Sequence, residues 1–129
     1  MNYQHSSEQD LFSKIIDMKN GSEIYIDISN KSDELKKLRL LDLQRQSYEN
    51  LFTTCIVNND LASNQFNLEK FLEKYRDVYV GYGDINRGLI INSVGSKVYK
   101  LMIKENIRFS INWDLEAIVI SKHGHHCNS

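Results

Sequence analysis

The segment IRFSINW, Ile107–Trp113, decides the fold class, because its apolar and polar residues alternate along its whole length. A period of two places successive side chains on opposite faces of a β-strand. A turn near Asp114 leads into a second apolar run, Ala117–Ser121. The two segments together predict an antiparallel β-hairpin near the carboxyl end of the chain.

Two earlier segments also have the pattern of strands. In Ile24–Ser29, three isoleucines alternate with polar residues, which indicates a strand with one buried face. In Val78–Tyr82, two valines and a tyrosine stand at alternate positions, and the glycines of the overlapping segment Gly81–Asp84 mark its end. Glycine permits backbone conformations that other residues resist, so we predict a strand that ends in a loop there.

Apolar residues at three- and four-residue spacing predict four helices. The first follows a capping box at Ser6–Gln9, the second begins at Ser32, the third is a short helix capped by Asn67, and the fourth ends near Glu105. The order α, β, α, α, β, α, β, β departs from regular βαβ alternation. We therefore expect an α+β fold with a mixed or antiparallel sheet of about four strands and helices packed mainly on one face.

The length of 129 residues suits one hydrophobic core, so we predict a single domain over residues 1–129. We expect residues 1–5 and 123–129 to be flexible tails. The polar stretch Val57–Gln65 is interpreted as a loop, because it is too short to separate two domains.

Charge and composition exclude several classes of protein. The formal net charge of −1 argues against a strongly basic nucleic-acid binder and against a polybasic membrane anchor. The amino terminus has no basic segment followed by an apolar one, and no apolar run is long enough to cross a bilayer. The two cysteines, Cys55 and Cys127, are too few for a disulfide framework. These features predict a cytoplasmic protein without a membrane span.

The last seven residues hold the clearest chemical cluster. If the final strand continues, His123, His125 and Cys127 share one face and His126 lies on the other. Imidazole and thiolate are ligands that suit zinc or another transition metal, so these four residues are candidate metal ligands. The alternative interpretation is a polar tail that binds no metal.

A helix face and a glycine-rich segment raise two other kinds of binding. Lys97, Lys100 and Lys104, with Arg108 nearby, could form a basic patch for RNA or DNA, although such spacing is also typical of a solvated helix face. The segment Gly81–Gly88 resembles a phosphate-binding loop in composition, but its spacing fits neither a dinucleotide fingerprint nor a Walker motif.

The sequence shows no convincing catalytic set, so a non-enzymatic role is favoured. We predict a small protein-binding module: an inhibitor, an immunity-type protein, an adaptor or a regulator. Its partner-binding candidates are of the residue types enriched at interface hot spots, namely Tyr79, Tyr82, Arg87, Tyr99 and Trp113. An unpaired strand edge could also accept a partner strand or a second copy of the chain, which would give a homodimer. The alternatives are a zinc-binding protein and a nucleic-acid-binding regulator.

Overall fold

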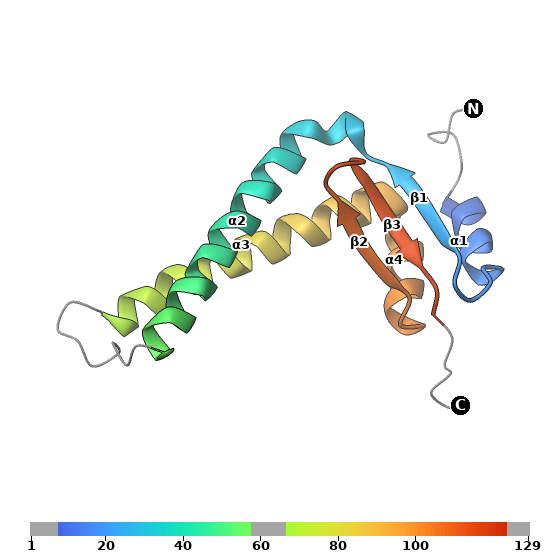
Figure 1. The fold of residues 1–129 in the computed structure, drawn as a ribbon. Helices are drawn as coiled ribbons and strands as arrows, with labels where there is room; N and C mark the ends of the chain where they lie inside the picture. Colours follow the sequence, from blue (N-terminus) through green and yellow to red (C-terminus); the bar gives the residue numbers. More distant parts are fainter. Residues whose placement is uncertain (1–7, 58–66, 124–129) are drawn as a thin grey trace, which may run out of the picture. The chain divides into compact units, whose positions relative to one another are not determined.

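The computed structural model describes residues 8–57 and 67–123 and has an α+β fold. Their elements follow one another as α1 (Glu8–Ile16), β1 (Glu23–Asp27), the 3-10 turn η2 (Ser29–Lys31), α2 (Ser32–Val57), α3 (Leu68–Val94), α4 (Ser96–Lys104), β2 (Arg108–Asn112) and β3 (Ala117–Ser121) (Figure 1). The chain divides into two compact units, one formed by the described residues of 1–32 and 88–129 and the other by those of 33–87.

The first unit contains an antiparallel sheet with the strand order β1-β3-β2. Figure 1 shows β3 lying between β1 and β2. The predicted hairpin is confirmed: β2 pairs with β3, and Ser110 stands opposite Val119. The described chain has three strands where we predicted about four, because the segment Val78–Tyr82 is helical.

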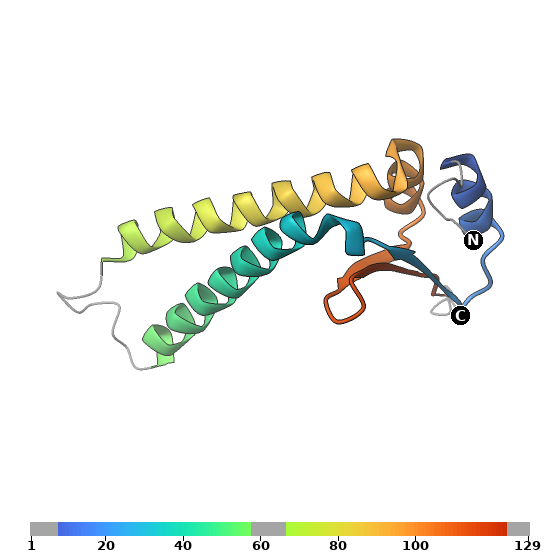
Figure 2. The ribbon, with the colours of Figure 1, turned by 90° about the horizontal axis from the view of Figure 1, so that it is seen from above.

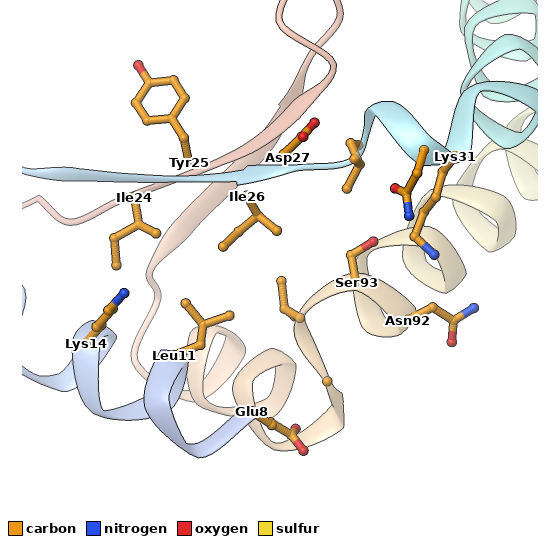
Figure 3. A pocket seen from close by; sticks show the side chains of 14 residues that line it. Glu8, Leu11, Lys14, Ile24, Tyr25, Ile26, Asp27, Lys31, Asn92 and Ser93 are labelled. Atoms are coloured by element: carbon orange, nitrogen blue, oxygen red, sulfur yellow. The ribbon is translucent and has the colours of Figure 1, made fainter. Parts of the chain in front are cut away.

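The sheet buries one face more than the other. Ile118 and Ile120 of β3 are completely buried, and full burial of one such side chain stabilises a fold by about 2 kcal/mol. Figure 3 shows Ile24 and Ile26 pointing from β1 toward α1, whereas Tyr25 points to the opposite side of the strand. The period-two pattern of the sequence therefore separates a face toward α1 from an open face.

Helix α4 is joined to α1 by a side chain that acts as a cap. Val98 and Met102 of α4 are fully buried. The Glu8 carboxylate of α1 accepts hydrogen bonds from the backbone nitrogens of Lys97 (2.6 Å) and Val98 (3.3 Å). A helix begins with unpaired N–H groups and a partial positive charge. The Glu8 carboxylate therefore stabilises the start of α4 and holds α1 against it.

The predicted strand at Val78–Tyr82 and the loop after it are wrong, since both lie within the 27-residue helix α3. The predicted cap of this helix is confirmed, because Asn67 Oδ1 accepts a hydrogen bond from the Lys70 nitrogen (3.0 Å). Gly81 costs helix stability but faces Leu41 of α2, whose Cδ1 would lie 3.9 Å from an added Cβ. Among the described residues, the glycines with positive φ are Gly21 and Gly95, so none of those in α3 makes a turn.

The second unit is an antiparallel helical hairpin of α2 and the first part of α3 (Figure 2). Where α2 ends and α3 begins, the ring of Phe71 packs against Tyr48 (centroids 5.6 Å apart) and Phe52 (5.7 Å). These ring contacts join α2 to α3 at this end of the hairpin.

The single-domain expectation stays a prediction beside the two compact units. Val57 of the predicted loop ends α2, and residues 58–65 of that loop lie outside the described residues. The predicted tails also lie outside them, except for His123. Among the described helices, none combines the length and apolarity that crossing a membrane requires.

Candidate functional site

Strand β1 forms one edge of the sheet, and its outer backbone groups face away from β3. The Lys122 nitrogen donates to the Ser22 oxygen (3.3 Å), and the Ile28 nitrogen donates to the Glu116 oxygen (2.9 Å). Because backbone groups alternate between the two sides of an antiparallel strand, the N–H and C=O groups of Glu23, Tyr25 and Asp27 point outward. Within the described residues, no strand pairs with them.

An open groove of about 640 Å³ lies beside this edge. Apolar side chains of α1, of β1 and the residue directly after it, and of the end of α3 line the groove. These are Leu11, Ile24, Ile26, Ile28 and Val94. Lys14, Lys31 and Asn92 are among the polar residues that line it. We call this cavity the β1 groove. Figure 3 shows Ile24 and Ile26 above the groove and Leu11 and Lys14 rising toward them from α1.

The lining of the β1 groove is apolar but incompletely covered. Ile28 and Val94 are almost fully buried, with 1% and 3% of their surfaces exposed. Leu11, Ile24 and Ile26 are half-buried, although they point into the same space. An added apolar side chain would therefore remove further apolar surface from water, at about 25 cal/mol per Å².

On the open face of the sheet, β1 carries two carboxylates, one on either side of a tyrosine. The Tyr25 hydroxyl donates a hydrogen bond to Glu23 Oε1 (2.7 Å), which raises the pKa of Tyr25. The Asp27 carboxylate accepts a hydrogen bond from the Ser29 backbone nitrogen (2.9 Å), which lowers the pKa of Asp27. Among the described residues, neither carboxylate belongs to an ion pair. The open face of the sheet is therefore acidic along β1.

The residues predicted to bind a partner belong to different units. Tyr79 is 54% exposed on α3, Tyr82 lies under the Arg45 guanidinium (5.2 Å to the ring centroid), and Arg87 pairs with Asp84 (2.7 Å). In the other unit, the Tyr99 ring packs 5.8 Å from Phe109, and Trp113 is half-buried in the β2–β3 turn. Their partner-binding role stays a prediction.

The predicted metal cluster lies mostly outside the described residues. β3 ends at Ser121, although Lys122 still exchanges backbone hydrogen bonds with Gly21 and Ser22. His123 is exposed, and the other candidates, His125, His126 and Cys127, are not described. In the part of the chain that the structure describes, no three His, Cys, Asp or Glu side chains are grouped to hold a metal ion. Zinc binding at these residues stays a prediction.

The basic residues have a simple placement. Lys97, Lys100 and Lys104 are exposed on α4, and Arg108 is exposed at the start of β2. This agrees with either a solvated face or a basic patch, so nucleic-acid binding also stays a prediction. The segment Gly81–Gly88, in contrast, is helical and cannot form a phosphate-binding loop.

The sequence analysis did not predict the β1 groove, although the sequence contains one of its features, the apolar face of β1. The isoleucines at 24 and 26 mark an apolar strand face, but the edge position of β1 comes from the order β1-β3-β2. That order depends on pairing between residues almost a hundred positions apart, such as Tyr25 with Val119. The groove combines unpaired backbone groups with apolar side chains, and both can bind an extended chain.

Comparison with known proteins adds no family assignment. No protein-family model matches the chain, and searches of curated proteins and of solved structures find no match either.

Proposed function

We propose that this chain is a protein-binding module that accepts an extended segment of another protein as an added strand along β1. The observation that carries the proposal is the coincidence of the outward backbone groups of Glu23, Tyr25 and Asp27 with the β1 groove on one face of the same strand. Backbone hydrogen bonds would supply affinity, and alternate side chains in the groove would supply specificity.

An extended peptide fits this site better than a compact small molecule does. The five residues of β1 extend over about 17 Å, because a strand rises about 3.4 Å per residue. The N–H and C=O groups along this edge repeat at the spacing of another strand. A compact ligand would fill part of the groove and leave most of these groups to water.

Neighbouring side chains hold the groove in shape before any partner binds. The Glu8 carboxylate connects α1 to the start of α4, because it accepts hydrogen bonds from the backbone nitrogens of Lys97 and Val98. Helix α1 also carries Leu11 on the groove side. Ile28 and Val94 are packed into the core of the same unit. A site that is largely formed in advance loses less free energy on ordering when its ligand arrives.

The experiment uses NMR titration of the full chain with a neutral synthetic peptide, Ser-Gln-Ile-Thr-Ile-Gln-Ser, which alternates apolar and polar residues. We expect the amide signals of Glu23, Tyr25 and Asp27, and those of Leu11 and Val94, to shift together. A second peptide, N-methylated at the amides that would face β1, should bind much more weakly, because it lacks the ladder hydrogen bonds.

A pair of variants separates the backbone from the side chain of Tyr25. Tyr25→Pro removes one outward N–H but breaks no hydrogen bond between β1 and β3, and proline is tolerated at such an edge position. Tyr25→Thr keeps the N–H and serves as the matched control. Binding that is lost in the proline variant and kept in the threonine variant supports the proposal. Equal binding to both variants, or shifts that avoid the β1 groove, would exclude it.

A further inference from the structure

We infer that the partner segment carries Lys or Arg at the two positions opposite Glu23 and Asp27, with apolar residues between them that enter the β1 groove. This inference rests on the proposed function and names the chemistry of its partner. It follows from which side chains of β1 lie on each face of the sheet.

Side chains directly opposite each other on paired strands lie on the same face of the sheet. Partner residues opposite Ile24 and Ile26 would thus enter the β1 groove, and those opposite Glu23 and Asp27 would lie on the open face. The preferred segment therefore reads basic, apolar, any residue, apolar, basic. β1 itself reads acidic, apolar, Tyr, apolar, acidic in either direction, so the same partner pattern fits parallel and antiparallel pairing.

The acidic face is free to select a basic partner. Glu23 and Asp27 are exposed, and no described cation forms an ion pair with either of them. Across the sheet, the nearest basic residue in the Glu23 row is Arg108, which stands on β2 beyond Ser121. The charge of both carboxylates is therefore available to an incoming strand.

The same charges disfavour a second copy of this chain as the occupant. If two β1 strands paired antiparallel about Tyr25, each Glu23 would stand opposite the Asp27 of the other copy. Like charges that are directly opposite destabilise a strand pair. Repulsion between these carboxylates therefore disfavours a homodimer through this edge, whereas a basic partner strand meets no such repulsion.

Three peptides test the inference on the full chain: the neutral peptide, a version with Lys in place of both Gln residues, and a version with Glu there. We expect the Lys peptide to bind about tenfold more tightly than the Glu peptide, since each opposed charge pair changes the binding constant a few-fold. Raising the salt concentration should reduce this preference, because both charges are exposed to solvent. The double variant Glu23→Lys/Asp27→Lys should prefer the Glu peptide.

A peptide of the same composition controls for unspecific attraction. Its core Ile-Lys-Thr-Lys-Ile exchanges the apolar and basic positions, so it cannot place both lysines opposite the carboxylates and both isoleucines in the groove. It should bind more weakly than the peptide with the core Lys-Ile-Thr-Ile-Lys.

The outcomes separate this inference from the proposed function. If the neutral peptide binds at β1 but all three peptides bind within about twofold of one another, the charge inference is wrong and the proposed function stands. If none of the peptides binds at β1, both fall. A dimer in sedimentation that Tyr25→Pro dissociates would identify a second copy as the occupant and overturn the inference.

Discussion

Gly95→Ala should destabilise the sheet-containing unit by about 1–3 kcal/mol, for two separate reasons. Gly95 joins α3 to α4 with φ at 95° and ψ at 152°, a backbone region that is essentially restricted to glycine. An added Cβ would also overlap the carboxyl group of Glu8, which caps α4 through Lys97 and Val98.

The magnitude follows from these two parts. The backbone conformation costs a residue with a Cβ about 1–3 kcal/mol. Displacing the Glu8 carboxylate removes a helix cap, which contributes about 1 kcal/mol. Alanine also restricts the unfolded chain, which returns at most about 1 kcal/mol to the stability of the variant.

The assay is urea unfolding followed by the fluorescence of Trp113, the chain's one tryptophan, which lies in the same unit as Gly95. Glu8→Ala should cost about 1 kcal/mol by itself. In the Glu8→Ala background, Gly95→Ala should cost about 1 kcal/mol less than it does in the natural chain, because the overlap is gone. A cost below about 0.5 kcal/mol for Gly95→Ala, or strictly additive costs for the pair, would refute this account.

Three further predictions concern the helical hairpin. Gly83→Ala should stabilise the chain by about 0.5–1 kcal/mol in urea unfolding, since this helical position has open space for a Cβ; a loss of stability would contradict the helix. Asp42→Ala should cost about 2 kcal/mol in the same measurement, because the buried carboxylate accepts hydrogen bonds from Arg45 (2.8 Å) and Gln46 (3.0 Å); a neutral effect would show that these hydrogen bonds do not stabilise α2. The pKa of Glu49 is lowered, first by the hydrogen bond from the Tyr75 hydroxyl and then by Arg45, so its contribution to stability is present above its unfolded pKa and is lost as the pH falls through the folded pKa. Melting temperatures measured at acidic pH should therefore fall less steeply for Glu49→Gln than for the natural chain, and identical slopes would exclude this role.

Local patterns in the sequence predict most elements of the fold. The helix start at Ser32, the cap at Asn67, the alternation of Ile24 and Ile26, and the β2–β3 hairpin all appear in the structure. Each of these signals depends on residues within a few positions of one another, so no long-range information is needed to interpret them.

The error at Val78–Tyr82 shows where a short pattern fails. Val78, Val80 and Tyr82 alternate as the apolar residues of a strand do. A longer pattern also runs through this segment: its apolar residues are spaced by four, three and four positions, as on a buried helix face, and they are Phe71, Tyr75, Val78 and Tyr82. All four are at least half-buried in the structure. The longer period was the stronger signal, and the glycines concealed it because glycine normally disfavours a helix interior.

The β1 groove could not be predicted in the same way. Its edge depends on β1 pairing with β3 and not with β2, and its apolar lining comes from α1, β1 and the end of α3. Neither the strand order nor the meeting of these elements follows from local periodicity. The sequence therefore predicts protein binding only in general, and the proposed position of the binding site at β1 depends on the sheet order.

Polar residues between α2 and α3 also fix how the hairpin pairs. Arg45 lies over the Tyr82 ring, and one helical turn farther along α2 Glu49 accepts a hydrogen bond from Tyr75 (2.9 Å). A slip of α3 by seven residues would place Leu68 at the position of Tyr75 in one direction, or Leu89 at the position of Tyr82 in the other. Either slip deprives Glu49 or Arg45 of its aromatic partner, so these contacts favour a single register, as polar residues do between other paired helices.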